Sequence, residues 1–209
     1  MEKKVLIPLH YLPSISYFAC LTEADSIIIE ANENFQKQTY RSRCYINTAN
    51  KIDTLSVPTK KSKSRLFKDT QIDYTEPWTK KHWKSIISAY GKAPFFEYFI
   101  DSFEVIYSKK EKYLFDLNMA LLTNCLKLMQ LDKTIIFSEV YEKQPQSTII
   151  DLRARLNTKT TDEHTIFFTP HPYNQIFGKE FVGNLSIIDL LFCEGPNALS
   201  VIRQSVAKY

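Results

Sequence analysis

KVLIPLHYLPSISYFACLTEADSIIIE, residues 4–30, decides the fold class of this protein. Its first four residues form an apolar run bounded by Pro8, which is typical of a short buried strand. Residues 14–24 fit a short helix with Ser14 as its N-cap and one apolar face. The apolar run from Ser26 to Glu30 fits a second strand. A strand, a helix and a strand within thirty residues predict a parallel βαβ unit.

The remainder of the chain continues this α/β plan and predicts a mostly parallel central sheet flanked by helices. The middle, about residues 78–131, repeats apolar side chains with a helical period and is expected to be rich in helices. The other expected elements are a hairpin built from 44–46 and 53–58, a buried strand at 134–137, another strand at 165–168, and closing helices at 185–191 and 198–206. With 209 residues and no internal repeat, the chain is expected to form one domain, residues 1–209.

Composition argues against several classes of function. The chain has only 4 glycines and no G-x-G-x-x-G or G-x-x-x-x-G-K-S/T run, so nucleotide binding would need a device other than a glycine-rich loop. The net charge of +4 is compatible with an anionic small-molecule substrate and too weak to indicate nucleic acid. No apolar run reaches 18 residues, so we expect no membrane span.

The four cysteines indicate a reducing compartment. Cys20, Cys44, Cys125 and Cys193 are scattered and form no C-x-x-C pair. Because the first residues also lack a signal-peptide pattern, we expect free buried thiols in a cytoplasmic protein. The histidines and cysteines show no metal-ligand spacing, so we expect no metal site. The sequence leaves the cofactor and the oligomeric state open.

A polar stretch, EANENFQKQTYRSR, follows directly after the second predicted strand. The carboxyl ends of parallel strands border the usual ligand crevice of an α/β sheet. Two glutamates there offer acid or base groups, while Lys37, Arg41 and Arg43 match a carboxylate or phosphate. The same residues also fit a surface turn into an edge strand, with both arginines on one face. Spacing alone leaves both interpretations open.

Two histidine-containing segments add further candidates. His10 and Tyr11 follow the first strand and are expected near the same crevice, where His10 suits an acid, a base or a phosphate donor. Lys81 and His82 begin the helical middle and suit a phosphate, although cations there oppose the helix dipole. The alternatives are a structural histidine at a strand end and a solvated helix start.

The segment from Lys60 to Lys68 carries five lysine or arginine residues, and its simplest interpretation is a mobile loop. Apart from Phe67 it lacks the interleaved aromatic side chains that single-stranded nucleic acid needs for stacking. Its charge still suits the steering of an anionic substrate.

The closing helix at 185–191 contains one acid in an apolar run. We expect Asn184 to cap this helix. Asp189 needs a partner because an unpaired buried carboxylate is costly. We expect it either to pair with one of the arginines or to cap structure elsewhere. A structural role is favoured for Asp189.

Five blocks together resemble the WbqC-like protein family, and they cover roughly half of the chain. They are HYLPSISYF from residue 10, ADSIIIEANENFQKQTYRSRCYI from 24, LSVP from 55, WTKKHWKSIISAYGKAPFFEYF from 78 and NLSIIDLLFCEGPNA from 184. The form E-A-x-E-N-x-x-K-Q-x-Y-R resembles a Bacteroidetes-type variant. Where many relatives carry paired aspartates this chain has Ala31 and Asn32, which puts paired-aspartate metal chemistry in doubt.

The resemblance implies an enzyme of bacterial surface-polysaccharide (O-antigen-type) biosynthesis. The most plausible activity is a transferase that acts on a nucleotide-linked sugar or an activated acyl donor. The expected catalytic residues are His10, Glu30 and Glu33. The expected substrate-binding residues are Tyr11, Asn32, Asn34, Lys37, Gln38, Tyr40, Arg41, Arg43, Lys81 and His82.

Two alternatives stay open beside the transferase. One is a non-catalytic adaptor in a polysaccharide assembly system, which an exposed aromatic surface would favour. The other is a divergent nucleotidylyltransferase, by analogy with the H-x-G-H motif at a helix start. Here Ser16-Tyr17-Phe18 replaces the second histidine and its glycine, and Ser147 only faintly echoes that superfamily's serine-rich helix start.

Overall fold

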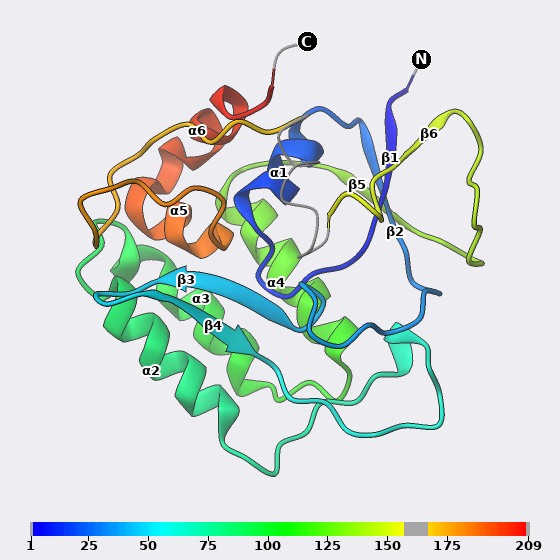
Figure 1. Ribbon diagram of the computed structural model, residues 1–209, viewed down its shortest axis with the longest axis horizontal. Helices are drawn as coiled ribbons and strands as arrows, with labels where there is room; N and C mark the ends of the chain where they lie inside the picture. Colours follow the sequence, from blue (N-terminus) through cyan, green and yellow to red (C-terminus); the bar gives the residue numbers. More distant parts are fainter. Residues whose placement is uncertain (1, 157–166, 208–209) are drawn as a thin grey trace.

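The computed structural model describes residues 2–156 and 167–207 and has an α/β fold built on a parallel sheet (Figure 1). The sheet has the order β5-β2-β1-β6. Its strands are β1 (Lys4–Ile7), β2 (Ser26–Ile29), β5 (Thr134–Phe137) and β6 (Ile149–Asp151). All three pairings are parallel. The predicted βαβ unit is confirmed, with helix α1 (Ile15–Thr22) between β1 and β2.

Helix α1 begins under a cap that comes from the far end of the chain. Ser14 occupies the N-cap position but its side chain makes no capping bond and pairs with the Ser16 hydroxyl instead. The Asn184 side chain accepts a hydrogen bond from the Ser16 backbone N–H at 2.9 Å. The expectation that Asn184 caps its own helix is therefore wrong, because that helix, α5 (Ile187–Glu194), takes Ser186 as its N-cap residue.

The two edge strands differ from the sequence interpretation. β5 lies where a strand was predicted, but it is largely exposed because it has a partner on only one side within the described residues. The faint similarity of Ser147 to a serine-rich helix start does not correspond to a helix, since Ile149–Asp151 forms strand β6 beside β1. Most of the strand expected at 165–168 lies outside the described residues. Phe168 makes an isolated bridge to Val206.

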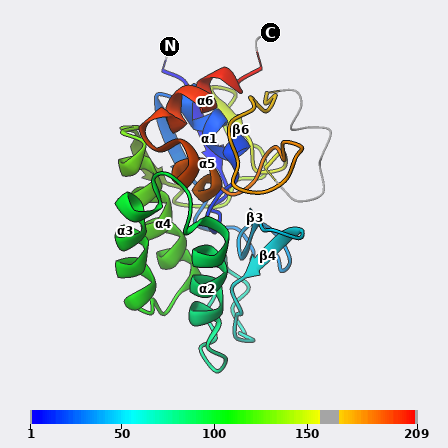
Figure 2. The ribbon, with the colours of Figure 1, turned by 90° about the vertical axis from the view of Figure 1, so that its left-hand side faces the viewer.

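The helix-rich middle consists of α2 (Trp78–Tyr90), α3 (Phe96–Ser108) and α4 (Leu114–Leu128). These helices lie together in the lower half of Figure 2, and the predicted hairpin of β3 (Arg43–Asn47) and β4 (Ile52–Ser56) lies beside α2. Amphipathic spacing explains the arrangement: for example, Ile86 and Tyr90 of α2 point inward, whereas Ile87 is exposed.

The last helices, α5 (Ile187–Glu194) and α6 (Ala198–Gln204), close the core against α1. One hydrophobic cluster joins the strands β1 and β2, the hairpin and all of these helices. All four cysteines are buried free thiols, as expected. None of the helices in the described part of the chain is long and apolar enough to cross a membrane.

Candidate functional site

The carboxyl edge of the sheet carries polar groups from three of its strands. Glu30, directly after β2, is buried and accepts hydrogen bonds from the Ser138 hydroxyl at 2.6 Å and from the Asn32 backbone N–H at 2.9 Å. Its second oxygen accepts from Arg153 Nη1 at 3.0 Å. Ser138 follows β5 and Arg153 follows β6. The polar residues expected at this edge are therefore there, but Glu30 is held by internal partners.

Arg153 is the part of this edge that the sequence interpretation missed. Its guanidinium bonds both oxygens of Asp151, at 3.0 and 2.7 Å, and the Glu142 carbonyl at 2.7 Å. It also lies over the Tyr141 ring, with 4.8 Å from Cζ to the ring centroid. Although burial alone raises the pKa of Asp151, the bonds from Arg153 hold it below the ordinary value. Because β6 itself was missed, no signal placed Arg153 beside Glu30.

Glu33 and Arg41 form a second internal ion pair, which is buried. Arg41 Nε donates to one oxygen of Glu33 at 2.6 Å, and Nη2 donates to the other. Their side chains are only 6% and 4% exposed. Burial raises the pKa of Glu33, and the Arg41 guanidinium opposes that rise. Arg41 also accepts a bond at its carbonyl from buried Asn118, so the pair is anchored to α4.

His10 packs between two tyrosine rings at the end of β1. Its ring is 5.0 Å from the Tyr17 ring and 5.3 Å from the Tyr40 ring, centroid to centroid, and the residue is buried. The Tyr40 backbone carbonyl accepts from the Tyr11 N–H at 2.9 Å, so the polar stretch folds back on this turn. Burial raises the pKa of Tyr40 to about 12.

Tyr11 and His82 also meet, in the core, where the turn after β1 reaches α2. The Tyr11 hydroxyl is 2.8 Å from His82 Nδ1 and also bonds the Tyr107 hydroxyl. Burial lowers the pKa of His82 to about 4, so the imidazole is neutral near pH 7. Lys81 points outward and pairs with Glu76 at 3.0 Å on the surface. The side chains of Lys81 and His82 therefore point to different places, the first to the surface and the second into the core, and do not form one site.

The remaining expected residues spread along the polar stretch. Asn32 is held between the Ser138 carbonyl, at 2.8 Å, and Lys68 Nζ, at 2.7 Å. Arg43 begins β3, and its buried Nε has no hydrogen-bond partner in the part of the chain that is described. Three further residues, Asn34, Lys37 and Gln38, are exposed, and Gln38 has a positive φ of 62°.

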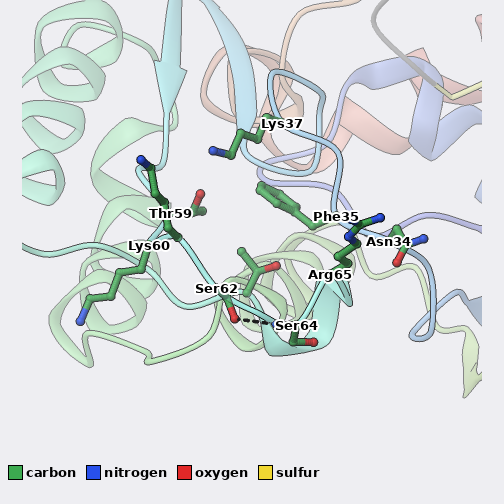
Figure 3. Close-up of a pocket in the computed structure, with 10 residues that line it drawn as sticks. Asn34, Phe35, Lys37, Thr59, Lys60, Ser62, Ser64 and Arg65 are labelled. Atoms are coloured by element: carbon green, nitrogen blue, oxygen red, sulfur yellow. Dashed lines mark hydrogen bonds between the residues drawn. The ribbon is translucent and has the colours of Figure 1, made fainter.

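A cleft of about 480 Å³, which we call the basic cleft, lies between the polar stretch and the segment after β4 (Figure 3). Its lining includes four cations and no acid among the described residues. They are Lys37, Lys60, Lys61 and Arg65. None of the four makes an ion pair within 4.0 Å of an acid in residues 2–156 and 167–207.

The floor and walls of the basic cleft are held by backbone contacts. The Phe35 ring lies in the middle of the labelled side chains in Figure 3 and stacks on Phe67, 6.0 Å away and inclined by 16°. The Phe35 N–H donates to the Arg65 carbonyl at 2.8 Å, and Thr59 bridges to Ile72. The segment interpreted as a simple loop is thus paired to the rest of the chain at both ends.

A second pocket of about 400 Å³, which we call the amide pocket, adjoins the cleft. Its walls are three amides, one acid, one leucine and one aromatic ring. They are Asn32, Glu33, Asn34, Gln36, Leu66 and Tyr141. Asn34 lines both cavities, and we call its isolated β-bridge to Leu66, which lines the amide pocket, the ridge.

Asp189 has a structural environment that differs from the expectation of an arginine partner. The hydroxyls of Tyr90 and Tyr173 donate to its two oxygens at 2.9 and 2.5 Å, and Gln175 Nε2 donates at 3.1 Å. Burial raises its pKa, while these three donors oppose the rise. The cluster ties the segment before α5 to helix α2. Elsewhere among the described residues, no three His, Cys, Asp or Glu side chains gather as metal ligands would.

The fold and its cavities define an α/β protein with two adjoining pockets in the segment that follows β2. The chain matches the WbqC-like protein family over residues 9–164 and 160–201, and it belongs to that family. It is 26% identical over 234 residues to "Uncharacterized protein Rv1507c" of Mycobacterium tuberculosis, across 98% of this chain and 100% of that relative. No solved structure gives a significant match.

Proposed function

We propose that the protein is a transferase and that its donor carries phosphate groups that bind in the basic cleft. The observation that carries this proposal is a cavity lined by Lys37, Lys60, Lys61 and Arg65 without an acid partner among the described residues. Like charges gathered around one cavity raise the local concentration of anions, and an arginine fork matches phosphate oxygens. The volume of about 480 Å³ lies in the usual range for small-molecule sites.

A nucleotide suits the cleft better than a bare anion. The Phe35 ring is supported from behind by Phe67 and presents a fixed aromatic surface beside the cations. Base–aromatic stacking tolerates every base. The hydroxyls of Ser62 and Thr59 add donors and acceptors for phosphate or ribose. We therefore assign a nucleotide-linked donor, in the context of bacterial surface-polysaccharide synthesis with which the family is associated.

For the acid or base of the reaction we propose Glu33. It is the one acid that lines the amide pocket among the described residues, and burial raises its pKa. Glu30 and His10 lie deeper, at 1% exposure each, and we assign them to holding the edge in place. Glu33→Gln also breaks the pair with Arg41, so its urea unfolding is measured beside its activity. In the folded variant it should abolish release of the nucleotide from its donor while leaving binding in the cleft within threefold.

Binding of nucleoside diphosphates tests the donor assignment. A ligand at a hundredfold its Kd adds about 2.7 kcal/mol of stability, which a thermal-shift screen detects readily. We expect a shift with UDP, ADP, GDP or CDP, and a tenfold to hundredfold weaker Kd in Arg65→Gln, because a bond to a charged group contributes about 1.5–3 kcal/mol. Lys109→Gln, which removes an equal charge at the end of α3, is the matched control.

The adaptor is the second candidate, and one observation favours it. Apolar side chains are exposed around the end of β5, with Phe137 at 48% and Val140 at 62%. Such surface suits a protein partner. Flat melting temperatures with every nucleoside diphosphate, in the parent chain and in Arg65→Gln alike, would favour the adaptor over the transferase.

A further inference from the structure

We propose that the amide pocket is a sugar subsite, so that the donor is a nucleotide-linked sugar rather than an activated acyl group. This inference rests on the proposed function of the basic cleft and adds the identity of the transferred group. It concerns Asn32, Glu33, Asn34, Gln36, Leu66 and Tyr141, which enclose about 400 Å³.

The chemistry of the amide pocket differs from that of the cleft. No lysine or arginine lines it among the described residues, whereas four line the cleft. Three amide side chains supply both donors and acceptors, and that mixture matches hydroxyl groups, which also donate and accept. A phosphate, which mainly accepts, fits the cleft better. The basic cleft therefore suits an anionic group, and the amide pocket suits a neutral polar group.

Two of the amides have capacity to spare. The side chains of Asn34 and Gln36 are exposed, and within the described residues neither makes a side-chain hydrogen bond. Asn32 is already held by Ser138 and Lys68 and acts as a fixed wall. Asn34 and Gln36 are thus the groups that a sugar hydroxyl would engage.

The apolar part of the pocket comes from Tyr141 and Leu66. Arg153 lies over the Tyr141 ring at 4.8 Å, and the tyrosine is still 50% exposed. A ring held in this way offers the C–H face of a sugar a flat apolar surface at low entropic cost. An extended acyl chain would leave the amides around it without partners, which is costly.

One ligand can occupy both cavities because the two cavities meet at Asn34. Asn34 lines both, and the Phe35 N–H bonds the Arg65 carbonyl at 2.8 Å. Figure 3 draws the Arg65 side chain beside Asn34. A phosphate held by Arg65 would therefore have its next substituent at the Asn34–Leu66 ridge, from which the amide pocket opens.

Calorimetry with UDP and UDP-glucose, and with the ADP, GDP and CDP pairs, tests the subsite. We expect the conjugate of the preferred base to bind at least fivefold tighter than its bare nucleoside diphosphate. Gln36→Ala should remove that advantage and leave the Kd of the bare nucleotide within twofold. Gln144→Ala, an exposed glutamine on the loop of Tyr141, is the control and should keep the advantage.

The outcomes separate this inference from the proposed function. Equal Kd values for conjugate and bare nucleotide, or an advantage that survives Gln36→Ala, overturn the sugar subsite and leave the cleft assignment standing. Absence of binding by every nucleoside diphosphate overturns the proposed function and the subsite together. Tighter binding of acetyl-CoA than of every nucleotide sugar, sensitive to Gln36→Ala, would assign the pocket to an acyl donor instead.

Discussion

The carboxyl edge of the sheet and the basic cleft both contain cationic side chains, but only those at the edge are paired with acids. At the edge, Glu30 pairs with Arg153 and Glu33 with Arg41, and the four side chains are between 1% and 9% exposed. In the cleft, Lys37 and Arg65 are exposed and have no ion-pair partner among the described residues. Charge at the edge is neutralised internally, whereas charge in the cleft is left for a ligand.

Burial decides whether a charged side chain is available for binding. A buried charge requires a partner because desolvation costs several kcal/mol, so the acids and arginines at the edge hold one another. An exposed cation is solvated at little cost and can exchange water for an anion. The four predictions that follow test this division, beginning with the largest effect.

Breaking the Glu33–Arg41 pair should have the largest effect on stability. Arg41→Met leaves the Glu33 carboxylate buried without its bidentate partner, and we expect a loss of about 3–5 kcal/mol in the free energy of unfolding. Urea unfolding measures it. The double variant Glu33→Gln, Arg41→Met should lose less than the sum of the two single variants, because the two side chains contact each other. Additive losses would mean that the pair is not coupled.

The pH dependence of stability should report the buried, neutral His82. Its folded pKa is about 4, against about 6.5 in an unfolded chain. Between these values the unfolded state binds more protons, so stability falls as pH falls from 6.5 to 4, by up to about 3 kcal/mol. Urea unfolding between pH 7 and pH 4 gives the free energy of unfolding as a function of pH, and we expect it to fall less steeply with falling pH in His82→Gln than in the parent chain. An equal pH dependence in the two proteins would indicate a solvated imidazole at this position.

Asp151 lies between the two extremes, since its side chain is 31% exposed while that of Arg153 is 9% exposed. Asp151→Asn should cost about 1 kcal/mol, because it weakens one partly solvated pair and leaves Glu30 in contact with Arg153. The loss should shrink in 1 M NaCl, where charges are screened. A loss of stability equal to that of Arg41→Met would mean that the partly exposed Asp151–Arg153 pair contributes as much as the buried Glu33–Arg41 pair.

Removing a cation from the cleft should change stability least. Arg65→Gln should alter the free energy of unfolding by less than about 0.5 kcal/mol, because the arginine is exposed and makes no ion pair within the described residues. The same variant should weaken the binding of a nucleoside diphosphate at least tenfold. A large loss of stability here would show that the cleft cations hold the fold, and the contrast between the two regions would disappear.

The sequence predicted the framework of the fold and part of the candidate site. The βαβ start, the hairpin and the helical middle follow from local apolar periodicity, which acts over a few residues. The polar stretch was correctly placed after β2 at the carboxyl edge. The sequence did not indicate the exposure of β5 or the existence of β6, because both depend on what lies beside a strand rather than on the strand itself.

Which side chains bond to one another depends on the tertiary structure and could not be predicted from the sequence. Arg153 reaches Glu30 across 123 positions, Asn184 caps α1 from 168 positions away, and His82 turns to Tyr11 while Lys81 turns to solvent. Local periodicity and propensity were enough to place the βαβ start, the hairpin and the helices of the middle, since both are properties of neighbouring residues. Which charges are neutralised and which line a cleft depends on burial and on residues far along the chain, so folding alone settled it.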